Sequence, residues 1–173
     1  MKKMSDPADR SVLREGQDRL RAMVLVHERL YRSDSLSRIE MGEYLHALVG
    51  QLRESHGPRV NAIAVQYAFA ECALDAERAL PLGMILAELV SNVFKHAFPN
   101  DMSGELRISL ERDASNMRLV VSDDGVGLPA DAMVENAGFG TRLAQNLALQ
   151  LGGALRVTVD GGTTVSVEFP CPV

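Results

Sequence analysis

The N-terminal part of the chain carries hydrophobic positions at helical spacing, in two successive runs. Between Ser11 and Tyr31, apolar residues recur three and four positions apart with charged residues on the other faces, which predicts an amphipathic helix. Its stripe consists of Leu13, Leu20, Met23, Val24, His27, Leu30 and Tyr31. The same spacing from Met41 to Leu52 predicts a second helix, which ends before Pro58. We therefore expect residues 1–57 to form a helical segment.

After Pro58 the pattern changes to one of strands and helices. From Ile63 to Phe69, apolar side chains alternate with small or polar ones, as in a half-buried strand. Pro81 suits the first turn of a helix, and the sequence DGG at 160–162 predicts a hairpin turn. The expected elements are a strand at 63–69, a helix at 82–97, strands at 106–110 and 117–121, a helix at 141–151, and strands at 155–159 and 165–169. This order predicts an α+β domain over residues 58–173, a two-layer sandwich whose mixed sheet is covered by helices on one face.

Charge and cysteine content narrow the partners and the compartment. The net charge of −5 and pI near 5.4 lack the basic excess that binds a phosphate backbone, so no nucleic-acid partner is expected. Cys72 and Cys171 have no CxxC or Cys/His spacing, which argues against a zinc site or disulfide scaffold and favours a reducing cytoplasm. No apolar run approaches the roughly 20 residues that span a bilayer, and the start MKKMSDPADR is unlike a signal peptide. We expect a cytoplasmic chain without membrane contact.

Four polar residues share one face of the expected helix at 82–97. They stand at positions i, i+4, i+7 and i+8, and they are Glu88, Asn92, Lys95 and His96. Asn92 can supply a neutral oxygen to Mg²⁺, and Lys95 can supply a positive charge to a phosphate. The alternative is an ordinary solvated face of an amphipathic helix.

A second group of candidate residues follows the expected strand at 117–121. Asp123 stands at the end of this strand, where a carboxylate can accept a hydrogen bond from an exocyclic amine such as that of adenine. Gly125 and Gly127 would let the backbone approach a ligand closely. The alternative is a tight turn rich in aspartate and glycine.

A third group, Gly138, Phe139, Gly140 and Thr141, lies where the helix at 141–151 is expected to begin. The free backbone N–H groups and the positive end of the helix dipole can receive phosphate there. The alternative is a hinge followed by a threonine cap. The glycines match neither the dinucleotide fingerprint nor a P-loop.

The order of these segments resembles the GHKL ATPases. ELVSNVFKHAF resembles their N-box, DDGVG their first glycine box, GFGTRL their second, and GGTTVSVEFP their closing strand. The resemblance extends from about Val60 to Pro170. It implies a Bergerat ATP-binding fold with Mg-ATP as ligand.

NVFKHAFP and the upstream QDRLRAMVLVHERLYRSDSLSRIEMGEYL further resemble sensor histidine kinases of the HisKA_2 and HWE type. This resemblance implies transfer of the ATP γ-phosphoryl group to a histidine and onward to a response regulator. It assigns Asn92 to Mg²⁺, Lys95 to phosphate and Asp123 to the adenine amine, with Thr163 assisting at the adenine. The glycines of both boxes would shape the pocket and its lid. Glu88 would be the catalytic residue that orients or deprotonates the attacking histidine.

The chain departs from that pattern in three places. It has no tryptophan, so the Trp-x-Glu signature of the HWE group is absent and the HisKA_2 type is favoured. The segment between the glycine boxes, LPADAMVENA at 128–137, would form a shorter lid than the family's, which leaves no clear match to its longer lid elements. No run like HHRVKN is present, so we expect the first helix of the dimerisation hairpin, with the phosphoacceptor histidine, to lie outside this chain.

His27 is the rival acceptor because His27-Glu28 imitates a His-acid dipeptide. Its place on the apolar stripe instead predicts a residue packed at a helix interface. The stripe is wide enough for a possible homodimer through the N-terminal helices. His46 and His56 have no ligand companions, and His96 is expected to line the pocket.

Two other functions fit the same fold. One is a phosphotransfer or adaptor protein with a degenerate ATP domain. The presence of Glu88, Asn92, Asp123 and both glycine boxes argues against it. The other is an anti-sigma serine kinase, which the N-terminal helices do not support.

Overall fold

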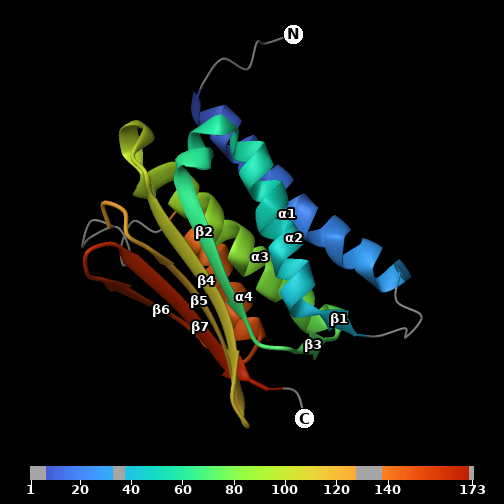
Figure 1. The fold of residues 1–173 in the computed structure, drawn as a ribbon. Coiled ribbons are helices and arrows are strands. Elements are labelled where there is room, and N and C mark those ends of the chain that lie inside the picture. Colours follow the sequence, from blue (N-terminus) through green and yellow to red (C-terminus); the bar gives the residue numbers. More distant parts are fainter. Residues whose placement is uncertain (1–6, 33–37, 128–137, 172–173) are drawn as a thin grey trace.

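A computed structural model describes residues 7–32, 38–127 and 138–171, and the expected lid at 128–137 lies outside these ranges. A five-stranded sheet forms one layer and helices cover one of its faces (Figure 1). The sheet order is β2 (Ile63–Phe69), β4 (Gly104–Arg112), β5 (Asn116–Asp123), β7 (Thr163–Pro170) and β6 (Ala154–Val159). The helices are α1 (Pro7–Arg32), α2 (Met41–His56), α3 (Ala76–Asn92) and α4 (Phe139–Gln150). The predicted α+β sandwich with a mixed sheet is confirmed.

Both expected hairpins are present. β4 pairs antiparallel with β5, and β6 pairs antiparallel with β7. In β4, β5 and β7, buried side chains alternate with more exposed ones, so this register buries one face of the sheet. β2 is the exception in direction, since it runs parallel to β4 with Ile63 opposite Gly104. A two-stranded pair of β1 (Ile39–Glu40) and β3 (Ala73–Leu74), too short for a periodicity signal, was not predicted.

The central helix α3 begins earlier than the sequence pattern indicated. Asp75 caps it, with its side chain accepting a hydrogen bond of 2.9 Å from the backbone N–H of Arg78. Pro81 therefore lies inside the helix, and its assignment to the first turn is wrong. Similarly, α4 begins at Phe139 with Gly138 as its N-cap, so Thr141 lies in its first turn and is not the cap. In both helices, the start is set by the N-cap residue, Asp75 or Gly138, where the extended backbone ends.

After Asn92 the helix continues as one π-helical segment, η2 (Val93–Ala97). A π-turn holds more residues than an α-turn, so it rotates the following side chains relative to α-helical spacing. Short 3₁₀ segments occur at η1 (Pro58–Ala62) and η3 (Pro99–Asp101). The π segment alters which residues of the N-box-like sequence face the sheet and the pocket.

Helix α1 packs along α3 and α2 on the outer side of the helical layer (Figure 1). Its buried face consists of Asp18, Ala22, Leu25 and Val26. The predicted stripe points the other way, with Leu13 49% exposed, Leu20 60% and Val24 53%. His27 is also exposed on this chain, and its expected packing at a helix interface stays a prediction. The side chains of Leu30 and Tyr31 lie outside the described set.

A glycine in α3 allows the three helices to meet. An added Cβ at Gly83 would lie 1.8 Å from the hydroxyl oxygen of Tyr44, a fully buried residue of α2. That hydroxyl donates a hydrogen bond of 3.1 Å to the backbone carbonyl of Ala22 in α1. Residues on both sides of position 57 thus share one hydrophobic core. The division of the chain into 1–57 and 58–173 remains a prediction.

In the described part of the chain, no helix combines the length and apolar character needed to cross a membrane.

Candidate functional site: a pocket between the helices and the sheet

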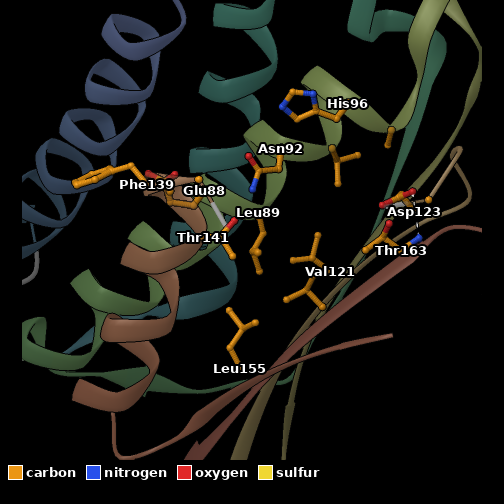
Figure 2. Close-up of a pocket in the computed structure, with 16 residues that line it drawn as sticks. Glu88, Leu89, Asn92, His96, Val121, Asp123, Phe139, Thr141, Leu155 and Thr163 are labelled. Atoms are coloured by element: carbon orange, nitrogen blue, oxygen red, sulfur yellow. Dashed lines mark hydrogen bonds between the residues drawn. The ribbon is translucent and has the colours of Figure 1, made fainter. Parts of the chain in front are cut away.

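A cavity of about 280 Å³ lies between α3, α4 and the sheet. Figure 2 shows Asp123 and Thr163 at one end of it and Glu88 with Phe139 at the other. Its lining comprises Glu88, Leu89, Asn92, Val93, His96, Ala97, Val121, Asp123, Gly127, Gly138, Phe139, Gly140, Thr141, Leu155, Thr163 and Val165. All three groups of candidate residues thus contribute to one cavity, although they are far apart in the sequence.

The polar face of α3 reaches the cavity through three of its four predicted residues. Glu88, Asn92 and His96 line it, and the side chain of Asn92 points into it (Figure 2). Lys95 is not among the lining residues. The π-turn that starts at Val93 explains this, because its wider turn keeps His96 in line with Asn92 and rotates Lys95 away. The assignment of Lys95 to phosphate stays a prediction.

Asp123 forms the polar end of the cavity on the sheet side. It is 9% exposed, and one of its carboxylate oxygens accepts hydrogen bonds from the backbone N–H groups of Gly125 at 3.0 Å and Thr163 at 3.4 Å. Burial raises the pKa of the Asp123 carboxyl, while these two hydrogen bonds act in the opposite direction. One oxygen is therefore held by the backbone, which leaves the other available to a ligand.

The glycines of the first box have different positions. Gly127 lines the cavity with a φ of 73°, a conformation that favours glycine. Gly125 is outside the lining, and an added Cβ there would lie 2.3 Å from the carbonyl oxygen of Ala97. Its neighbour Val126 donates a backbone hydrogen bond of 2.9 Å to the same carbonyl. Gly125 therefore lets the loop after β5 lie against the end of the π-helical segment.

The opposite end of the cavity is formed by the first turn of α4. Gly138, Phe139, Gly140 and Thr141 all line it, as the sequence suggested. An added Cβ at Gly140 would lie 2.2 Å from a carboxylate oxygen of Glu88, so α4 approaches α3 closely at this point. Glu88 itself is 4% exposed. A buried carboxylate is thus placed beside the N-terminus of a helix.

Sequence reasoning missed two components of the site. The first is an apolar wall of Leu89, Val121, Leu155 and Val165, whose strand members alternation could have assigned to the inward face. The second is Arg19 of α1, whose Nε donates to a carboxylate oxygen of Glu88. No local pattern predicts a contact between residues so distant in the chain.

The remaining histidines lie elsewhere in the described structure. The ring of His46 lies 4.6 Å from that of Tyr67, measured between centroids. In His56, Nδ1 is 2.8 Å from the carbonyl oxygen of Leu52, and burial lowers the pKa of its imidazole. Neither lines the cavity, whereas His96 does.

This geometry agrees with what is found when the chain is compared with known families. Residues 77–173 match the family described as "Histidine kinase-, DNA gyrase B-, and HSP90-like ATPase". The chain belongs to this ATPase family. Residues 1–56 of the ATPase chain match a second family, HisKA_2, described as histidine kinase. The GHKL and HisKA_2 resemblance is confirmed, and membership in an ATPase family implies ATP binding.

The individual proteins to which the chain is similar are also named as histidine kinases. Blue-light-activated histidine kinase 2 of Erythrobacter litoralis is 31% identical over 135 residues, which are 76% of this ATPase chain and 38% of the relative. Sensor histidine kinase PdtaS of Mycobacterium tuberculosis is 29% identical over 177 residues, covering 98% of the chain and 34% of the relative. The solved histidine kinase domain from the Erythrobacter litoralis EL346 blue-light activated histidine kinase matches with a TM-score of 0.81 at 26% identity, over 90% of this chain and 74% of that one. The chain spans little more than a third of the length of these curated relatives.

Proposed function

We propose that this chain is the ATP-binding catalytic portion of a two-component sensor histidine kinase. It transfers the γ-phosphoryl group of ATP to a histidine, from which the group passes to a response regulator. The observation that carries the proposal is that Glu88, Asn92 and Asp123 surround one cavity in a chain of the histidine kinase-like ATPase family.

The two ends of the cavity suit the two ends of ATP. The carboxylate of Asp123, which the backbone holds in place beside Thr163, accepts a hydrogen bond from the adenine amine. The first turn of α4 offers its N–H groups to the phosphates. The apolar wall between the two ends excludes water from the nucleotide.

Asn92 suits a magnesium ion that is held mainly by the nucleotide. The described residues contain no cluster of three or more His, Cys, Asp or Glu side chains that could hold a metal. Mg²⁺ commonly keeps several waters and binds through one or two protein oxygens together with substrate phosphates, which matches a single carboxamide in the pocket. When bound, the ion neutralises the negative charge of the phosphates.

Glu88 is the residue that acts on the acceptor. The imidazole nitrogen of the acceptor attacks the γ-phosphorus, the bond from phosphorus to the bridging oxygen breaks, and ADP leaves with the electron pair. Glu88 accepts the proton that the other imidazole nitrogen loses. Most of the remaining rate enhancement comes from positioning and charge stabilisation.

The outward stripe of α1 is the surface through which this portion meets the acceptor helix. Leu13, Leu20 and Val24 are each about half exposed, which is unusual for apolar residues that recur on one helix face. A helix hairpin or a homodimer formed there would bury them. Light scattering on wild type and on Leu20→Glu would separate a dimer through this stripe from a monomer.

The test is calorimetric titration of Mg-ATP into the wild type and into Asn92→Ala, followed by phosphorylation of a supplied dimerisation helix that bears a histidine. We expect binding and transfer in the wild type and a loss of both in the variant. Binding without transfer to any histidine would contradict the kinase assignment. No binding in the wild type would favour the adaptor with a degenerate ATP domain.

A further inference from the structure

Arg19 joins helix α1 to the end of the pocket that takes the phosphates. Its Nε donates to a carboxylate oxygen of Glu88, and its guanidinium lies 4.8 Å from the ring centroid of Phe139. The side chain of Arg19 is 18% exposed and that of Glu88 is 5% exposed, so solvent screens this pair only weakly. A residue from outside the ATPase-family match at 77–173 thus contacts two residues of the pocket lining.

The residue before Arg19 fixes its position. Asp18 is 2% exposed and accepts a hydrogen bond of 2.8 Å from the hydroxyl of Ser91, which lies one turn after Glu88 on α3. Its other oxygen is 2.6 Å from a guanidinium nitrogen of Arg21 and 3.3 Å from the hydroxyl of Ser55. Asp18 therefore fixes the packing of α1 against α3 and α2, and this packing directs the side chain of Arg19 toward Glu88.

The negative charge of Glu88 at this end of the cavity makes a positively charged neighbour such as Arg19 important. A bound polyphosphate would place several negative charges near the buried carboxylate of Glu88, and like charges repel strongly where water is excluded. Asp123, the other buried carboxylate of the pocket, lies at the opposite end (Figure 2). Arg19 offsets the charge of Glu88 at the place where phosphate must approach.

We propose that Arg19 is a positioning residue of the nucleotide site, which offsets the charge of Glu88 and braces Phe139 so that the phosphate end accepts a polyphosphate. This inference rests on the proposed function, because it assumes that the nucleotide is bound with its phosphates toward α4. If Arg19 has this role, the packing of α1 on α3 helps to set the affinity for ATP. A residue that only stabilises the fold would not affect ATP, ADP and AMP affinities to different extents.

The test is calorimetry with Mg-ATP, Mg-ADP and AMP on Arg19→Gln, Glu88→Gln and the double variant. In Arg19→Gln the bare charge of Glu88 should weaken Mg-ATP binding about tenfold, Mg-ADP less and AMP least. In Glu88→Gln the unopposed arginine should tighten Mg-ATP binding. The double variant should return close to wild type, because no unbalanced charge is left. Arg59→Gln removes an arginine paired with Asp101 at the surface and should change none of the affinities.

Arg19→Lys keeps the positive charge beside Glu88 but loses the planar guanidinium over Phe139, so it should lose less Mg-ATP affinity than Arg19→Gln, and it provides a second variant if Arg19→Gln folds poorly. Equal losses for ATP, ADP and AMP in Arg19→Gln, or no loss, would overturn the role of Arg19. So would a double variant that binds Mg-ATP as weakly as Arg19→Gln. Absence of Mg-ATP binding in the wild type would instead overturn the proposed function itself.

Discussion

The two ends of the pocket are built in different ways. At the end that we propose binds adenine (the adenine end), Asp123 is the last residue of β5 and Thr163 the first of β7, and these strands pair directly, with Asp123 opposite Thr163. At the end that we propose takes the phosphates (the phosphate end), Glu88, Phe139 and Arg19 come from three separate helices. Strand pairing fixes the first end through backbone hydrogen bonds, whereas the second depends on how helices pack. The adenine end is therefore preorganised, and the phosphate end is adjustable.

The largest effect should come from breaking the preorganised end. In Asp123→Asn the side-chain oxygen remains bound to the backbone N–H groups of Gly125 and Thr163, so the NH₂ group faces the adenine amine, a donor against a donor. We expect the affinities for ATP, ADP and AMP to fall together by about 100-fold, since the site was built for an acceptor. Calorimetry with the three nucleotides measures this, with Asp113→Asn in the β4–β5 turn as the control. A loss confined to ATP would contradict an adenine role.

A selective effect on the adjustable end should follow from Gly140→Ala. The new methyl group would lie 2.2 Å from a carboxylate oxygen of Glu88 and would displace it from Arg19. We expect Mg-ATP affinity to fall about tenfold, as for a steric cost of 1–2 kcal/mol, with little change for adenosine. Gly16→Ala is the control, because nothing lies within 4 Å of its added Cβ. Equal losses for ATP and adenosine would show that the two ends are not independent.

The helix packing under the phosphate end can be loosened without touching the pocket. In Gly83→Ala the added Cβ meets the hydroxyl of Tyr44, which cannot move because it is fully buried. We expect a loss of about 1–3 kcal/mol in the free energy of unfolding, measured with urea. Gly50→Ala, at an open helical position, should raise stability by about 1 kcal/mol. A Gly83→Ala variant as stable as wild type would mean that the crossing of α2 and α3 is looser than described.

The smallest effect should be on pH dependence at the adenine end. Burial raises the pKa of the Asp123 carboxyl, and only the ionised form leaves an acceptor for adenine. Adenosine affinity should therefore fall with decreasing pH before an ordinary carboxyl, with a pKa of 3.8, would be protonated. In the unbound protein the sign is opposite: the folded carboxyl keeps its proton to higher pH than the unfolded one, so its contribution to stability falls as pH rises through the raised pKa. Adenosine titrations of wild type and Asp123→Asn across acidic pH compare the two, and a flat wild-type profile would contradict the effect.

The same division separates what the sequence predicted from what it did not. Alternation along β4, β5, β6 and β7 is a local property, so the hairpins and the position of Asp123 at a strand end could be read directly. Helix α1 has apolar residues on two sides, and only tertiary contacts decide that Ala22 and Leu25 are buried while Leu20 and Val24 are not. The π-turn at Val93 and the contact of Arg19 with Glu88 are likewise set by packing. Local signals therefore predicted more of the strand-built end of the cavity, where Asp123 lies, than of the helix-built end, where Arg19 meets Glu88.

The parallel pairing of β2 with β4 has a consequence for how the chain folds. All of α3 lies between β2 and β4 in the sequence, so these strands cannot pair until that helix has crossed the sheet. The hairpins β4–β5 and β6–β7 can instead form by pairing outward from their own turns. Pairs that close long loops form slowly, because the entropy of closure is lost before contacts compensate for it. Pulse-labelled hydrogen exchange during refolding should therefore protect the hairpin amides first and those of β2 last. The helix that carries Glu88 and Asn92 would be enclosed in the final stage of folding.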